Sequence, residues 1–171
     1  MKKHSQSLCT VSMLVMDFDG IHTDGFVYVD ENGCETVRCS RRDGLGLEIL
    51  KNNGIKLCVI SKEKNPVVSA RCKKLDIEYY QGVDNSLGKK DILESLVMRE
   101  GFPIESVMYM GDDINDHDAM VYAGIAVTVA DGHEQIKNIA DIILKSKGGE
   151  HAIREIAEMI LVAKGIPLDF F

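Results

Sequence analysis

The chain has 171 residues, a length that suits one domain with a sizeable core. Its charged fraction of 27% and apolar fraction of 45% are ordinary for a soluble globular protein. A net charge of −7 and an isoelectric point near 5.2 argue against a nucleic-acid partner and against binding to an anionic membrane.

The N-terminal residues and the cysteines favour a cytoplasmic protein. Polar residues such as Ser5, Ser7 and Ser12 interrupt the first segment, so we expect no signal peptide. No apolar run approaches the roughly 20 residues of a membrane span. The five cysteines are odd in number and widely spread, which indicates reduced thiols rather than a disulfide framework.

Residues 11–18 form an apolar run that ends on two acids, Asp17 and Asp19, with Gly20 and Thr23 after them. Such a run predicts a buried strand that delivers acids to one edge of a sheet. In open α/β sheets, ligands bind at that edge.

A β-hairpin is predicted next, because two segments with β-branched residues, 26–29 and 34–39, flank a turn with the pair Asn32-Gly33. It precedes any helix. We therefore expect it to project from the sheet as a flap, at about residues 25–40.

From residue 43 onward, helical and strand patterns alternate. Asp43 is the predicted N-cap of a helix that Gly54 ends. Further helices are predicted at about 66–75, 89–100, 117–123, 134–139 and 153–163. Further strands are predicted at 56–61, 77–81, 106–110, 125–129 and 142–144. Gly148-Gly149 is interpreted as a flexible joint before the C-terminal helix and tail, at about 150–171.

This alternation predicts an α/β fold, a doubly wound three-layer sandwich with a mainly parallel sheet. We interpret residues 1–171 as a single domain. No insertion is long enough to form a cap domain over the active site.

Polar groups gather where the predicted strands end, and they indicate a magnesium site. Asp17 and Asp19 follow the first strand, Ser61 the second and Asp112 a later one, while Lys89 opens a helix. Clustered acids raise one another's pKa unless a cation lies among them. A hard divalent cation held by one or two carboxylates and by substrate phosphate oxygens is typical of Mg²⁺. Asp17 and Asp112 are the predicted side-chain ligands.

The same residues predict a phosphoryl-transfer reaction. Asp17 is the expected nucleophile on phosphorus, which would give an aspartyl-phosphate. Asp19 would protonate the departing alcohol and later take a proton from the hydrolytic water. Ser61 and Lys89 would hold the phosphoryl oxygens. For Asp116, two roles stay open: a helix cap, or support of Lys89.

These residues resemble the four motifs of the haloacid dehalogenase superfamily of phosphatases. The motifs are Asp17-Phe18-Asp19-Gly20-x-x-Thr23-Asp24-Gly25, Ser61, Lys89 and Gly111-Asp112-Asp113-x-x-Asp116. The flap and three further segments narrow the resemblance to the capless subfamily. Those segments are Arg42-Asp43-Gly44-x-Gly46, Gln81-Gly82-Val83 and Gly148-Gly149-x-x-Ala152-x-Arg154-Glu155.

The resemblance implies further properties of the site. Asp19 would add its backbone carbonyl as a metal ligand. The protein would be a homotetramer in which a neighbouring subunit roofs each active site. The substrate contacts of the subfamily fall on Asp19, Ser40, Arg41, Arg42, Asp43, Gly44, Glu48, Glu63, Arg71 and Lys89.

The subfamily includes phosphatases of 3-deoxy-manno-octulosonate 8-phosphate and of nonulosonate 9-phosphates, the phosphates of KDN and N-acylneuraminate. The octulosonate enzymes usually carry Ser-Gly-Arg after the second strand, where this chain has Ser61-Lys62-Glu63. A carboxylate can accept hydrogen bonds from sugar hydroxyls, whereas an arginine would pair with an acid. We therefore expect a nonulosonate 9-phosphate, with octulosonate 8-phosphate as the alternative.

Two alternatives from other classes are weaker. A phospho-acceptor signalling domain would place its acceptor aspartate where this chain has Ser61. A non-catalytic oligomerisation domain, like the one fused to some acylneuraminate cytidylyltransferases, would be favoured by loss of Asp17 or Asp19, and both are present.

Overall fold

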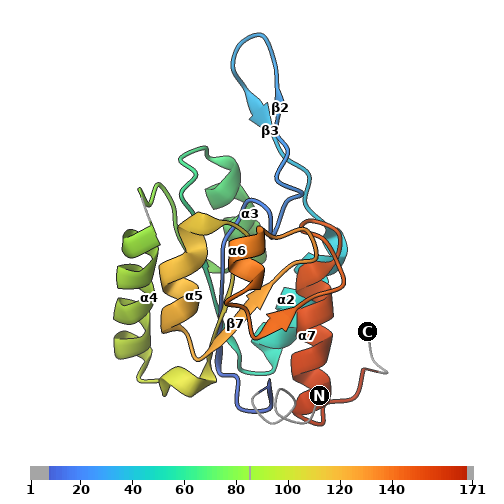
Figure 1. Ribbon diagram of the computed structural model, residues 1–171. Helices are drawn as coiled ribbons and strands as arrows, with labels where there is room; N and C mark the ends of the chain where they lie inside the picture. The colour runs from blue at the N-terminus through green and yellow to red at the C-terminus, as the bar shows by residue number, and fades with distance from the viewer. Residues whose placement is uncertain (1–7, 85, 169–171) are drawn as a thin grey trace.

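The computed structural model describes residues 8–84 and 86–168. The described residues form a six-stranded parallel sheet of order β5-β4-β1-β6-β7-β8 (Figure 1). Its strands are β1 Met13–Met16, β4 Lys56–Ile60, β5 Glu78–Tyr80, β6 Val107–Met110, β7 Ile125–Thr128 and β8 Ile142–Ile143. The predicted fold class is confirmed. The residues 1–7 and 169–171, on which the N-terminal and tail predictions partly rest, lie outside the described residues.

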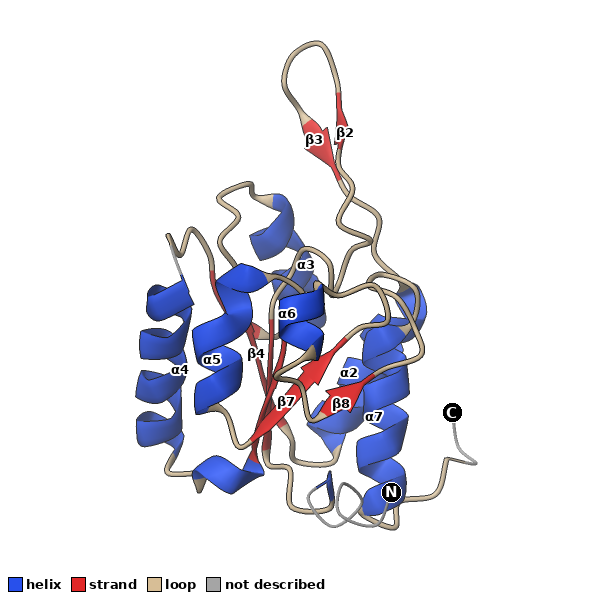
Figure 2. Cartoon of the chain, viewed as in Figure 1, coloured by secondary structure: helices blue, strands red, loops and turns tan. Residues whose placement is uncertain are grey.

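Helices cover both faces of the sheet (Figure 2). One face carries α2 Arg41–Asn52, α3 Val67–Leu75 and α7 Ala152–Ala163. The other carries α4 Ser86–Glu100, α5 His117–Tyr122 and α6 Glu134–Lys137. Two short 3₁₀ helices, η1 Ile104–Ser106 and η2 Ile114–Asp116, lie on either side of β6 in the chain. No helix in these described ranges is long and apolar enough to cross a membrane.

The central strand β1 explains why the first motif begins with an unbroken apolar run. Leu14 and Met16 pack against the α2 and α7 side, while Met13 and Val15 pack against the α4 and α5 side. All four side chains are fully buried, because a central parallel strand is covered on both faces. The register of β1 against β6 fixes the position of Asp17, because Met16 pairs with Met110 and the N–H of Asp17 donates to the Met110 carbonyl.

The predicted flap is confirmed as a projecting hairpin, although its strands are shorter than expected (Figure 2). β2 Tyr28–Val29 pairs antiparallel with β3 Glu35–Thr36. The Asp30 carboxylate closes the turn by accepting from the N–H groups of Asn32 and Cys34.

Helix α2 begins at Arg41, and its N-cap is Ser40 rather than the predicted Asp43. The Ser40 hydroxyl accepts from the N–H groups of Arg42 and Asp43 at 3.1 and 3.3 Å. The buried Asp43 carboxylate instead accepts from the N–H of Arg154 at 2.8 Å, in the first turn of α7. Asp43 therefore fastens one helix to the start of another, a pairing that local sequence signals do not specify.

The prediction of a flexible joint at Gly148-Gly149 is wrong. Both glycines are buried, and the N–H of Gly149 donates to the carbonyl of Ile21 at 3.0 Å. The missing side chains serve close packing against the loop after β1 rather than freedom of movement.

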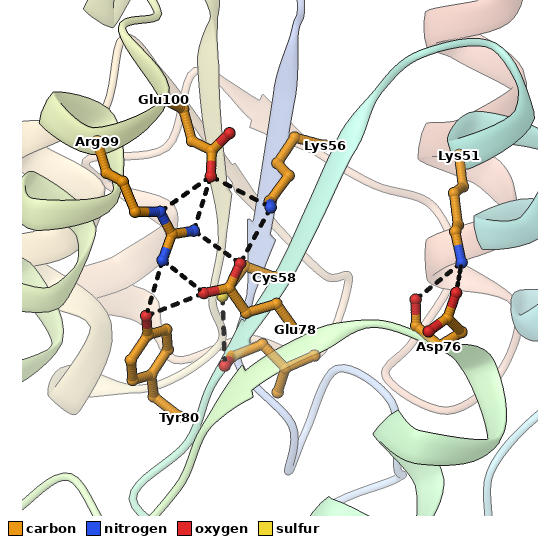
Figure 3. Close-up of polar contacts among 9 residues, drawn as sticks. Lys51, Lys56, Cys58, Asp76, Glu78, Tyr80, Arg99 and Glu100 are labelled. Carbon is orange, nitrogen blue, oxygen red and sulfur yellow. Dashed lines mark hydrogen bonds and ion pairs between the residues drawn. The ribbon is translucent and has the colours of Figure 1, made fainter.

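An ion-pair network fastens the edge strand β5 to the C-terminal end of α4 (Figure 3). Arg99 forms a bidentate pair with Glu78, and Glu100 contacts both Arg99 and Lys56. The Tyr80 hydroxyl donates to Glu78 at 2.9 Å. Charged side chains on an edge strand also disfavour pairing with another strand.

Candidate active site

Three neighbouring strands, β4, β1 and β6, end at one edge of the sheet and deliver the site. Asp17 follows β1, Ser61 follows β4 and Asp112 comes two residues after β6. A cleft of about 310 Å³ opens there, lined by Asp17, Asp19, Ser61, Lys62, Glu63 and Asn115. This arrangement agrees with the expectation that the ends of these strands meet in one crevice.

The acids after β1 and β6 meet closely. Carboxylate oxygens of Asp17, Asp112 and Asp116 all lie within 4.8 Å of one another. Gly20 permits this approach, because a Cβ on Gly20 would lie 1.9 Å from Oδ2 of Asp112. The glycine of the first motif therefore makes room for the acid of the last one.

Lys89 lies between two of these acids. Its ammonium is fully buried and stands 2.7 Å from Asp17 Oδ2 and 2.7 Å from Asp116 Oδ1. Because α4 begins at Ser86, Lys89 belongs to its first turns rather than opening the helix as predicted. The buried ammonium therefore pairs directly with the candidate nucleophile.

Of the two roles left open for Asp116, the structure shows support of Lys89, and its side chain makes no cap hydrogen bond to the following helix α5. Its Oδ1 accepts from Lys89 and from the Tyr109 hydroxyl at 2.9 Å, so it supports Lys89. Its Oδ2 accepts from the N–H groups of Asp112 and Asp113 at 3.1 and 3.4 Å, within a capping box at η2. These donors make Asp116 a fixed part of the scaffold, although it lies within metal-ligand range.

The electrostatics of the cluster favour a cation. Burial raises the pKa of Asp17 to about 7, with Asp116 adding to the rise and Lys89 opposing it. Burial and the other acids raise the pKa of Asp112 to about 8. Burial alone lowers the pKa of Lys89, but Asp17 and Asp116 outweigh it and the net shift is upward. Three acids share one ammonium, so a bound divalent cation would stabilise their ionised forms.

Asp19 is half-buried and is oriented by Thr23. The Thr23 hydroxyl donates to Asp19 Oδ1 at 3.3 Å and accepts from the N–H groups of Gly20 and Gly25. Burial raises the pKa of Asp19, while the hydrogen bond from Thr23 lowers it in part. A raised pKa suits a carboxyl group that has to hold a proton and then donate it.

Ser61 and Glu63 form the rim of the cleft beyond β4. The buried Ser61 hydroxyl accepts from the N–H of Glu63 at 3.1 Å. Glu63 Oε1 accepts from the N–H groups of Lys64 and Asn65 at 2.6 and 2.7 Å. One of the two Glu63 oxygens is therefore already engaged with local backbone.

The remaining substrate contacts implied by the resemblance do not reach this cleft within one chain. A separate cavity of about 520 Å³ lies between α2 and α3, and among its lining residues are Arg41, Gly44, Glu48 and Arg71. Another, of about 260 Å³, is lined partly by Ser40, Arg41 and Arg42. Asp43 is buried.

Three residues of the site, Tyr109, Asn115 and Lys62, were not predicted from the sequence. Tyr109 is the only residue of β6 whose side chain carries a polar group. Because it lies between Met108 and Met110, its side chain is on the face of the sheet that α4 and Lys89 cover. This single hydroxyl in an otherwise apolar strand could have indicated a role for Tyr109 at the site. Asn115 lines the cleft from η2, and nothing in its local sequence marks it.

Known proteins resemble this chain along most of its length. Residues 47–156 match the haloacid dehalogenase-like hydrolase family. The 3-deoxy-D-manno-octulosonate 8-phosphate phosphatase of Escherichia coli K12 is 35% identical over 157 residues, which cover 91% of this chain and 81% of the relative. The enzyme of the same name from Haemophilus influenzae is 34% identical over 148 residues, covering 86% of this chain and 81% of the relative.

Solved structures agree with these sequence matches. The Moraxella catarrhalis 3-deoxy-D-manno-octulosonate 8-phosphate phosphatase, in complex with magnesium ion, phosphate ion and KDO, superposes with a TM-score of 0.91. It is 35% identical, and the match covers 96% of this chain and 94% of that chain.

Proposed function

Because this chain belongs to the haloacid dehalogenase-like hydrolases, we propose that it is a magnesium-dependent phosphatase acting on the phosphate ester of a keto-sugar acid. The predicted enzyme class, a phosphoric monoester hydrolase, is confirmed by the matches. The observation that carries the proposal is the placement of Asp17 beside Asp112 and Lys89, in a cleft that Asp19 also lines. We assign the whole chain, residues 1–171, to this one catalytic domain.

The donor set fits the predicted Mg²⁺ cofactor, which the Moraxella catarrhalis relative binds. Asp17 and Asp112 would hold the ion with their carboxylates, and Asp19 with its backbone carbonyl, so that every protein ligand is a hard oxygen. When bound, Mg²⁺ would neutralise the acids and the phosphate enough for two anionic groups to approach.

The side chains then divide the reaction between them. The Asp17 carboxylate attacks phosphorus, and its new O–P bond forms as the bond from phosphorus to the sugar oxygen breaks. Asp19 gives its proton to that departing oxygen. In the second half, Asp19 takes a proton from the water that attacks phosphorus, and the Asp17 carboxylate is released. Ser61 and Lys89 are proposed to hold the phosphoryl oxygens.

For the substrate, we propose 3-deoxy-manno-octulosonate 8-phosphate, because the relatives that support the family assignment are named for this ester. This choice reverses the preference drawn from Glu63. The local bonds to Glu63 Oε1 supply a structural reason for an acid at this position that does not involve a sugar. The remaining carboxylate oxygen keeps a nonulosonate 9-phosphate as the second candidate.

The test is phosphate release with Mg²⁺ from a panel of 8- and 9-phosphorylated keto-sugar acids. We expect the octulosonate ester to have the highest kcat/KM. A preference for a 9-phosphate, reduced by Glu63→Gln, would restore the sequence-based choice. No turnover of any ester would overturn the proposal.

Asp17→Asn should abolish turnover while the fold is retained, because the amide cannot act as the nucleophile. Its circular dichroism spectrum and melting curve serve as controls for folding. Activity above about one thousandth of the wild-type rate would assign the nucleophile to another residue, since losing a covalent route removes several orders of magnitude.

We also propose a homotetramer in the cytoplasm. The flap carries four exposed apolar residues, Phe26, Val27, Tyr28 and Val29. The predicted substrate contacts on α2 and α3 line a different cavity from the cleft. We therefore propose that they complete the active site of a neighbouring subunit. The described chain contains no disulfide among its five cysteines, which is consistent with a reducing compartment.

A further inference from the structure

The segment between β8 and α7, residues 145–151, lies directly against the loop that carries Asp19. We call this segment the strap. The carbonyl of Ile21 accepts from the N–H of Gly149 at 3.0 Å, which joins the strap to the middle of the catalytic loop. Figure 1 shows the C-terminal part of the chain returning to the carboxyl end of the sheet before α7 begins.

The two strap glycines touch the catalytic loop so closely that no side chain fits. A Cβ on Gly148 would lie 1.8 Å from the carbonyl oxygen of Gly20 and 3.0 Å from that of Thr23. A Cβ on Gly149 would lie 2.5 Å from the backbone nitrogen of Asp24, and Gly149 also has a φ of +65°. Backbone meets backbone here, so no flexible side chain can move aside.

The strap is itself held in place. The N–H of Gly148 donates to Asp131 Oδ1 at 3.0 Å. Glu155, in the first turn of α7, accepts from the N–H groups of Lys145 and Ser146 at 3.0 and 2.8 Å. A segment held at both ends in this way can fix the conformation of the loop that packs against it.

One loop residue beside the strap also orients the acid. The carbonyl oxygen of Thr23 would lie 3.0 Å from a Cβ on either strap glycine, and the Thr23 hydroxyl donates to Asp19 Oδ1. The two metal-site acids, Asp17 and Asp112, follow β1 and β6 and are placed by the sheet instead. The strap therefore packs against the loop in which Thr23 orients Asp19, whereas the strands β1 and β6 lead directly to Asp17 and Asp112.

We propose that Gly148 and Gly149 are positioning residues, which set the orientation of the Asp19 carboxyl through Thr23 for transfer of a proton to the departing alcohol. The inference rests on the proposed role of Asp19. It assigns a function in the reaction to glycines that otherwise serve only the packing of the chain.

The test uses leaving groups, because an alcohol needs a proton in order to leave and p-nitrophenolate does not. We compare kcat for p-nitrophenyl phosphate with kcat for the best sugar ester, in Gly148→Ala and in Thr23→Val. Displacing the acid should reduce kcat for the sugar ester by about a hundredfold, a typical contribution of general acid catalysis, and that for the aryl ester much less.

Two glycines provide matched controls. Gly124→Ala also creates a clash with backbone, 2.2 Å from the carbonyl oxygen of Ile104 against 1.8 Å at Gly148, away from the catalytic loop. Gly165→Ala places a side chain at a positive φ of +72° in open space, which matches the backbone strain of Gly149→Ala without its clash. Both controls should reduce kcat for the two esters by the same factor.

Hydrogen–deuterium exchange of the peptide covering residues 18–25 gives a readout that does not require activity. Gly148→Ala should speed exchange there, and Gly124→Ala should not. Equal losses on both esters with unchanged exchange in residues 18–25 would overturn the inference. Absence of wild-type activity on any ester would overturn the proposed function instead. If Gly148→Ala does not fold, Gly149→Ala and Thr23→Val still decide the question.

Discussion

His22 is a buried titratable residue that the proposed reaction does not use. Its ring stacks on Phe18 with centroids 5.4 Å apart, and its Nε2 is buried without a hydrogen-bond partner among the described residues. Burial, aided by the charge of Arg71, lowers the pKa of His22 to about 3. The folded protein therefore keeps this histidine neutral through most of the acid range.

We predict that His22 contributes a loss of stability below pH 6.5, which the raised pKa values of Asp17 and Asp112 oppose. The unfolded chain takes up a proton on His22 near that pH and the folded chain does not, so the His22 contribution to the free energy of unfolding falls as pH drops from 6.5 toward 3. The limiting slope is about 1.4 kcal/mol per pH unit. His22→Phe keeps the stacked ring and should remove this slope in urea unfolding at pH 7.5 and pH 5.

The exposed His117 supplies the control, since His117→Gln should leave the slope of the wild type. Parallel stability curves for the wild type and His22→Phe would contradict the prediction. At pH 7.5 the phenylalanine variant should be at least as stable, because it removes an unpartnered buried nitrogen.

At the residue scale, the sequence was most informative where a side chain sits at a strand end. Asp17 and Asp112 follow buried strands, and the parallel sheet brings such ends together. It was least informative for contacts between distant segments. Gly148 was interpreted as a joint, because a glycine looks the same in sequence whether it provides freedom or close packing.

At the scale of the elements, strands and helices were predicted in the right order and their boundaries were less certain. Helix α2 begins earlier than predicted because Ser40, rather than Asp43, is its N-cap. Both residue types are good caps, and the choice depends on a distant partner, the N–H of Arg154 in α7. No local pattern contains that information.

The network at the end of α4 should contribute to stability only above the acid range (Figure 3). The hydrogen bonds from Arg99 lower the pKa of Glu78 from 4.5 to about 2, despite the opposing effect of burial. The stabilisation is therefore complete above pH 4.5, and it is lost as pH falls toward 2. Because Arg99 is half-exposed, solvent screens the pair and we expect only a small stabilisation.

Glu78→Gln should lower the melting temperature at pH 7 slightly and flatten its decline between pH 4.5 and 2, as measured by thermal unfolding in low salt. Glu134→Gln is the matched control, because Glu134 forms an exposed i,i+3 pair with Lys137 within one helix. Equal effects of the two variants would show that the network gives no more than a surface pair.

At the scale of the whole molecule, the sheet positions the candidate site, and the flap carries exposed apolar surface away from it. Phe26 and Tyr28 are 74% and 68% exposed, on a hairpin that projects away from both cores (Figure 1). Contiguous exposed apolar surface of this kind usually marks an interaction site. Nothing in the sequence of the flap distinguished a lid over its own cleft from a contact with another chain.

We predict that replacing Phe26 and Tyr28 together by serine converts the protein to a smaller assembly in sedimentation velocity. Kcat/KM for the sugar ester should fall at least about tenfold, because residues placed by a neighbour contribute binding energy that a lone chain lacks. Hydrolysis of p-nitrophenyl phosphate should persist, since Asp17, Lys89 and Asp112 belong to one chain. Met98→Ser, at an equally exposed apolar residue of α4, should change neither measurement. An unchanged sedimentation coefficient in the flap variant would exclude the flap as the interface and leave substrate selection to the cleft of the single chain.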